Sequence, residues 1–234
     1  MSSKRAAAES PAEEVAAGVF GQWLIEARAA LAGDHGANVP CGDCIGCCVS
    51  SYFIPVRPED TRAIARIPVD ALIRPGAQGG NAMLGYREDG TCPMLHARQC
   101  SIYADRPRTC RDYDCRIFAA AGIAAGGEDK HVINRRVRAW RFTYATPADW
   151  EAHEAVRNAA RFIRDQKASF PGGRAPATPM GIAVLALKTY KVFLDANVRA
   201  KSATDIATAV VAASREFDAN GHEGDAPPAG STEQ

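Results

Sequence analysis

Hydrophobic positions at the start of the chain recur with helical spacing. From Val15 to Leu31, apolar side chains return every three or four residues, which marks one face of an amphipathic helix. Pro11 and Glu13 suit the first turn of such a helix. We therefore predict an N-terminal helix that follows a disordered stretch at residues 1–10.

The same spacing dominates the second half of the chain. Ile133, Val137, Trp140 and Tyr144 are separated by four, three and four residues, which predicts a helix. Cap-forming residues and apolar periodicity predict three more helices, at residues 146–163, 180–197 and 202–217. A disordered tail is predicted after them, at residues 219–234.

Between these parts the pattern is short and irregular. Arg57 to Asp60 resembles a helix start, and the Asp89-Gly90 dipeptide favours a hairpin between 83–87 and 91–95. We predict a mainly α protein whose helices surround a small irregular cysteine-rich core with one short β-hairpin. The expected organisation is an N-terminal helix plus cysteine module at 11–118 and a helical part at 119–218.

Composition and charge narrow the classes of protein. Apolar residues make up 47% and charged residues 24%, which excludes a wholly disordered chain. The 28 basic and 27 acidic side chains nearly cancel, so the net charge indicates neither nucleic acid nor an anionic membrane as a partner. The basic run 134–141 is interpreted as a solvated helix face rather than a nucleic-acid surface.

The compartment expected from the sequence is the cytoplasm. The N-terminal residues lack the apolar run of a secretory signal, and no stretch reaches the roughly 18 apolar residues of a membrane span. All 8 cysteines lie between Cys41 and Cys115. In a reducing compartment, structural disulfides are rare, so thiolate chemistry is the better interpretation of this cluster.

The cysteines form two clusters. The first is Cys41, Cys44, Cys47 and Cys48, spaced C-x2-C-x2-C-C, with Gly42 and Gly46 permitting a tight backbone around an ion. The second cluster has wider spacings and consists of Cys92, Cys100, Cys110 and Cys115. Adjacent side chains generally point in different directions, so one of Cys47 and Cys48 is expected to lie outside the first centre or to serve a second one.

These motifs resemble the CxxCxxCC cysteine-cluster family (YkgJ-like), a zinc- or iron-chelating domain. The resemblance covers about residues 38–118 and rests on Cys41 to Cys48, Gly90 to Leu95, Cys100 to Tyr103, Arg106 to Arg111, and Cys115. It implies that the cysteines bind a metal ion. The helical remainder, 119–234, is not covered by it.

Electrostatics supports bound thiolates independently of that resemblance. Four thiolates around a divalent ion or a four-iron cluster leave a charge of about −2 that needs an offset when it is partly buried. The arginines of the second cluster supply cations, and Arg106 and Arg111 are the candidates for holding the cofactor. His96 is the one histidine inside the cluster and is interpreted as a solvated side chain.

The identity of the metal stays open between zinc and iron. The C-x2-C-x2-C run with a remote Cys92-Pro93 is typical of a [4Fe-4S] site, which slightly favours iron. Tetrahedral zinc sites suit the same thiolates. We predict a metal-binding protein with a structural or redox role. One alternative is an iron–sulfur-dependent modifying enzyme. The other is an adaptor protein in which the metal only stabilises the fold and the helices bind a protein partner.

Overall fold

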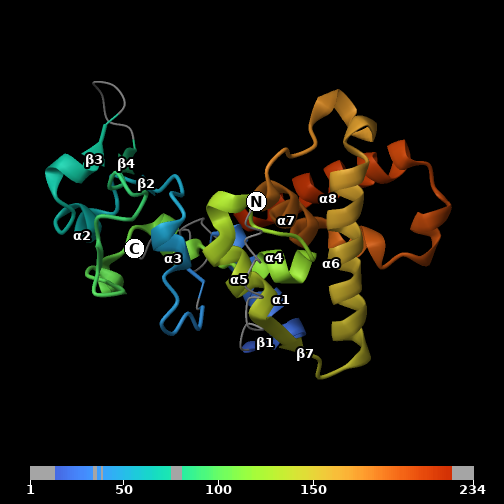
Figure 1. Ribbon diagram of the computed structural model, residues 1–234. Helices are drawn as coiled ribbons and strands as arrows, with labels where there is room; N and C mark the ends of the chain where they lie inside the picture. The colour runs from blue at the N-terminus through green and yellow to red at the C-terminus, as the bar shows by residue number, and fades with distance from the viewer. Residues whose placement is uncertain (1–13, 34–35, 38, 75–80, 223–234) are drawn as a thin grey trace, which may run out of the picture.

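The computed structural model describes residues 14–33, 36–37, 39–74 and 81–222. It divides into a helical part and a cysteine lobe, which lie on the right and on the left of Figure 1. Each part has its own cluster of buried apolar side chains. The predicted mainly α class with small β elements is confirmed.

The helical part packs around the larger apolar cluster. Phe20, Phe118, Ile163 and Leu187 are each fully buried in it. Its helices are α1 (Phe20–Ala32), α4 (Arg116–Ala121), α5 (His131–Ala139), α6 (Pro147–Asp165), α7 (Pro179–Thr189) and α8 (Ala203–His222).

The first strand corrects the predicted N-terminal helix. Residues Val15–Val19 form strand β1, and the helix begins only at Phe20. β1 pairs in parallel with β7 (Trp140–Thr143), a segment that we also predicted as helix. The two strands are more than a hundred residues apart in the sequence and are joined by backbone hydrogen bonds. Local periodicity cannot reveal such a pairing. Glu13 and Pro11 lie outside the described residues.

The later helices follow the prediction more closely. The helix cap predicted at Thr146 is present and forms a capping box, because its hydroxyl accepts from the Asp149 amide while the Asp149 carboxylate accepts from the Thr146 amide. The predicted helix 180–197 is shorter: α7 ends at Thr189, and the 3-10 helices η7 (Tyr190–Phe193) and η8 (Ala196–Ala200) follow. Residues 219–222, predicted as tail, are the last turn of α8.

The cysteine lobe consists of short elements around a smaller apolar cluster. Strand β4 (Ala82–Leu84) lies between β2 (Pro55–Val56) and β3 (Leu72–Ile73) in an antiparallel sheet. The remaining elements are the 3-10 helices η1 (Gly46–Val49), η2 (Val69–Ala71) and η3 (Tyr103–Asp105) and the helices α2 (Thr61–Ile64) and α3 (Arg108–Asp112).

The hairpin lies at a different place from the predicted one. A tight turn is present at Asp89-Gly90, where the Gly90 amide donates to the Arg87 carbonyl at 2.8 Å, but no paired strands flank it. The hairpin joins β5 (Leu95–His96) to β6 (Gln99–Cys100). Its turn residues Ala97 and Arg98 both have positive φ, the conformation of a two-residue hairpin turn without the usual glycine.

None of the helices in the described part of the chain combines the length and the apolar character that a bilayer span requires.

The predicted domain boundary near residue 118 stays a prediction.

Candidate metal centre

The first cysteine segment forms a tight loop that leads into η1. The Cys44 amide donates to the Cys41 carbonyl at 3.0 Å across a turn in which Gly42 has a φ of 57°. Cys47 and Cys48 then lie in η1 itself. A Cβ on Gly46 would stand 3.0 Å from Ile133 of α5, so glycine allows η1 to approach that helix closely.

The second cysteine segment runs back alongside the first. The Cys92 amide donates to the Cys48 carbonyl at 2.7 Å, which joins the two segments directly. Cys100 lies in β6, Cys110 in α3, and Cys115 immediately before α4. All eight cysteines are free thiols.

One group of four thiols faces the helical part. Cys115 belongs to the larger apolar cluster. Residue Cys47 as a whole is exposed, but protein atoms surround its thiol, and this desolvation raises the pKa of Cys47 well above its ordinary value. The neighbouring thiols of Cys115, Cys41 and Cys44 raise it further. Burial, then Cys44, raises the pKa of Cys41 in the same way. We call Cys41, Cys44, Cys47 and Cys115 the inner group.

A second group of four thiols belongs to the cysteine lobe. Cys48, Cys92, Cys100 and Cys110 all lie in or against the smaller apolar cluster. The Cys48 thiol hydrogen-bonds to Cys92, which lowers the pKa of Cys92 and raises that of Cys48. Burial raises the pKa of Cys110 to about 12, with Cys92 and Cys100 as the next causes. We call these four the outer group.

The division falls between the adjacent residues Cys47 and Cys48. Among its thiol neighbours, Cys115, Cys41 and Cys44 raise the pKa of Cys47 more than Cys110 of the other group does. Cys92 and then Cys100 raise the pKa of Cys48 more than Cys47 of the other group does. In the described part of the chain, no three His, Cys, Asp or Glu side chains are yet close enough together to hold one metal ion. The groups are thus neighbourhoods of thiols, and coordination of a single ion would draw their side chains inward.

Several thiols accept hydrogen bonds of the kind that stabilise a metal-bound thiolate. The Gly46 amide donates to the Cys44 sulfur at 3.5 Å. Backbone amides after Cys92, those of Met94 and Leu95, act on its sulfur in the same way and lower the pKa of Cys92. Such outer-shell donors hold a thiolate in place and offset its charge, so the residues present fit a thiolate-bound metal.

Burial keeps most of these thiols protonated when no cation is near. It raises the pKa of Cys115 to about 12, as it does for Cys110. A metal ion binds the thiolate, so binding at these sulfurs must release protons and weaken as the pH falls.

The arginines do not all lie where the sequence predicted. Arg106 acts on both groups, since its charge opposes the rise in the pKa of Cys41, Cys100 and Cys110. Its guanidinium carbon stands 3.7 Å from the centroid of the Tyr103 ring.

Arg111 instead faces a carboxylate. Its Nη2 lies 3.6 Å from Oδ1 of the buried Asp60. His96 is exposed, as predicted.

Two residues of the centre were missed by the sequence analysis. Arg136, in the run interpreted as a solvated face, donates to the Cys41 carbonyl and lowers the pKa of that thiol. Trp140, interpreted as packing alone, is buried and donates from Nε1 to the Cys115 sulfur at 3.2 Å. The available signal was their spacing from Ile133 of α5, at steps of three and then four residues; the Ile133 side chain lies against η1, although Trp140 itself lies in β7.

Comparisons with known proteins bear on the cysteine-rich segment. Residues 40–134 match the family model "CxxCxxCC: Putative zinc- or iron-chelating domain". No curated protein and no solved structure matches the chain. The match spans both cysteine groups and ends within α5, so the helices that follow are not covered by it. The predicted resemblance is confirmed: residues 40–134 are similar to the zinc- or iron-chelating CxxCxxCC domain.

Proposed function

We propose that this protein chelates metal at two separate centres, one held by the inner group and one by the outer group. The observation that carries the proposal is the division of eight free thiols into two sets of four, with adjacent Cys47 and Cys48 on opposite sides of it. Four thiolates are a complete ligand set for a zinc ion or for a four-iron cluster. A reducing compartment such as the cytoplasm is the proposed location, because thiols persist there.

Iron is the metal that we propose. The C-x2-C-x2-C run of the inner group is the spacing of a [4Fe-4S] site. When bound, a four-iron cluster supplies one-electron redox chemistry. Zinc is the alternative, because four thiolates are also a complete tetrahedral ligand set for that ion.

The surrounding residues would offset the negative charge of the bound thiolates. Arg106 and Arg136 place cations beside Cys41, and the Trp140 indole donates to Cys115. These charge-assisted contacts offset the negative charge of a thiolate set that is partly buried. Arg111 is proposed to act indirectly, by anchoring α3 to Asp60.

Elemental analysis tests the proposal directly. The full chain is purified without oxygen, and iron, zinc and acid-labile sulfide are measured per chain. Two four-iron clusters give about eight iron atoms and about eight sulfides. Two zinc ions and no sulfide would retain the two centres and overturn the choice of iron. A metal content near zero would overturn metal chelation itself.

Paired substitutions test the division into groups. Cys47→Ser with Cys115→Ser changes the inner group alone, so we expect about half the metal to remain. Cys47→Ser with Cys48→Ser changes both groups, so we expect nearly all of it to be lost. Asp43→Asn, an exposed change in the same loop, is the matched control and should leave the metal content unchanged. Equal losses in the two double variants would contradict two independent centres.

A further inference from the structure

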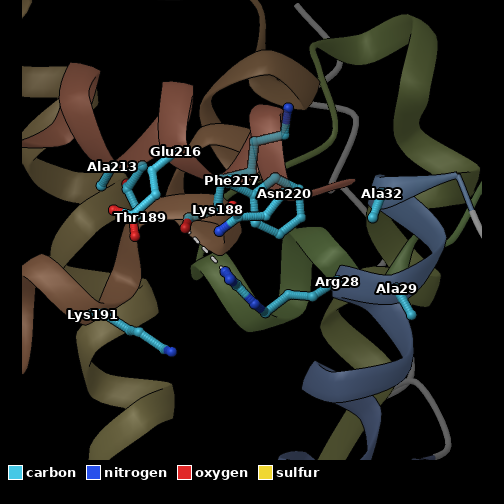
Figure 2. Close-up of a pocket in the computed structure, with 10 residues that line it drawn as sticks. All are labelled: Arg28, Ala29, Ala32, Lys188, Thr189, Lys191, Ala213, Glu216, Phe217 and Asn220. Carbon is cyan, nitrogen blue, oxygen red and sulfur yellow. Dashed lines mark hydrogen bonds between the residues drawn. The ribbon is translucent and has the colours of Figure 1, made fainter. Parts of the chain in front are cut away.

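A cavity of about 450 Å³ lies in the helical part, lined by α1, by the end of α7 with η7, and by α8. Figure 2 shows its lining residues, none of which is a cysteine. This volume is in the range of cavities that bind small molecules, about 300–1,000 Å³. The cavity therefore differs from the metal centre in both its place and its chemistry.

Arg28 crosses this cavity from α1 to α7 (Figure 2). Its Nη1 donates to the carbonyls of Leu187 and Lys188 at 2.5 and 3.0 Å. The guanidinium carbon also stands 4.6 Å from the centroid of the Phe217 ring. These contacts fix the side chain in place, while Nε and Nη2 make no hydrogen bond within the described residues. A planar cation held in this way presents three free N–H donors, one on Nε and two on Nη2.

The other charges leave the cavity positive. Lys188 is paired with Asp218 at 2.5 Å and is therefore neutralised. Lys191 is exposed and has no ion pair in the described residues. Glu216 is the one acidic side chain in the lining. Arg28 and Lys191 thus outnumber the single free carboxylate, which favours an anion.

The rest of the lining consists of small apolar side chains, one aromatic ring, and the polar side chains of Thr189 and Asn220. The Phe217 ring forms one wall, and Ala29, Ala32 and Ala213 line the space with methyl groups only. Small side chains leave room for a ligand, and the ring offers it an apolar contact.

We propose that this cavity binds a small organic anion, in which a carboxylate or phosphate group meets Arg28 and Lys191 and an apolar part of ring size contacts Phe217 and the alanines. Carboxylate and phosphate oxygens both suit the free donors of an arginine. The two chemistries are separated by the choice of probe.

Phenyl phosphate, benzoate and inorganic phosphate are the probes. Each is titrated by calorimetry into the metal-loaded full chain, and the metal content is measured before and after. We expect saturable binding of phenyl phosphate or benzoate, and the tighter of the two identifies the anionic group. Inorganic phosphate should bind at least about fivefold more weakly, because it lacks the apolar part. Equal affinity for inorganic phosphate would overturn the apolar contact.

Three variants locate the binding. Lys191→Gln should weaken it about fivefold by removing a charge, and Ala213→Leu should weaken it roughly tenfold or more by filling the cavity. Lys167→Gln is the control, because Lys167 is also an exposed lysine but lies outside the lining. Each variant is checked for an unchanged melting temperature. Absence of saturable binding, or an unchanged affinity in both cavity variants, would overturn the proposal.

Discussion

The helical part and the cysteine lobe differ in what holds them together. The helical part buries large side chains completely, among them Phe20, Phe118 and Leu187. The cysteine lobe has strands of two or three residues, and its smaller apolar cluster includes cysteines. Short strands and a small core are marginal without a further constraint. The comparison indicates that hydrophobic burial stabilises the helical part, and it predicts that the cysteine lobe depends on the proposed metal.

Metal removal should have the largest effect and should act on the cysteine lobe. The metal is withdrawn without oxygen, with EDTA for zinc or with a reductant and an iron chelator for iron. Binding to a structural site contributes on the order of 10 kcal/mol to folding. We expect the amides of residues 41–49 and 92–115 to lose protection in hydrogen–deuterium exchange measured by mass spectrometry, while α6 and α7 retain theirs. A mock-treated sample is the control, and uniform loss across the chain would contradict separate sources of stability.

A core substitution should destabilise the helical part and leave the metal content of the protein unchanged. Leu187→Ala removes a fully buried side chain and should lower the free energy of unfolding by about 3 kcal/mol. Urea denaturation measures this loss, and the metal content per chain should stay the same. Leu194→Ala is the matched control, because Leu194 is 46% exposed and its loss should cost about 0.5 kcal/mol or less. Loss of metal in Leu187→Ala would show that the two parts depend on each other.

The smallest effect of the three concerns a buried histidine of the helical part. His153 stacks on Phe20 at 4.2 Å, and its Nδ1 lies 2.8 Å from the Tyr144 hydroxyl. Burial, then the charge of Arg157, lowers the pKa of His153 from 6.5 to about 4. Between these values the unfolded chain binds the proton and the native protein does not, so stability is complete above about pH 6.5 and falls as the pH drops toward 4.

The expected loss between pH 7.5 and pH 4.5 is about 2.5 kcal/mol, which is less than the loss expected for Leu187→Ala. It is measured by urea denaturation at pH 7.5, 5.5 and 4.5. His153→Gln should remove this contribution, whereas His131→Gln, at an exposed histidine, should retain it. Other titrating groups act equally in both variants, so the difference between their slopes isolates His153. Parallel slopes would refute the assignment.

Local signals in the sequence predicted much of the helical part. The Thr146 capping box and the apolar periodicity of α6 depend on contacts within a few residues of each other. The cysteine motifs likewise predicted the family match at residues 40–134, because ligand spacing is local as well. Both predictions were confirmed.

Long-range contacts were not predicted. Local periodicity assigned β1 and β7 to helices, yet they pair with each other. The cysteine-cluster motif favoured Arg111 over Arg136, although Arg111 faces Asp60 and Arg136 reaches the Cys41 carbonyl. These contacting residues lie far apart in the chain, so the local sequence pattern around each of them does not indicate the contact.

The sequence alone determined which atoms are available for chemistry: eight thiols at metal-binding spacing, and helices with defined caps. Only the tertiary structure decided how those thiols divide, because in it Cys115 is the thiol that acts most on Cys47 and Cys92 is the thiol that acts most on Cys48. The physical reason is distance in space. Spacing along the chain fixes what one turn can reach, whereas burial and charge at a site depend on every segment that packs against it.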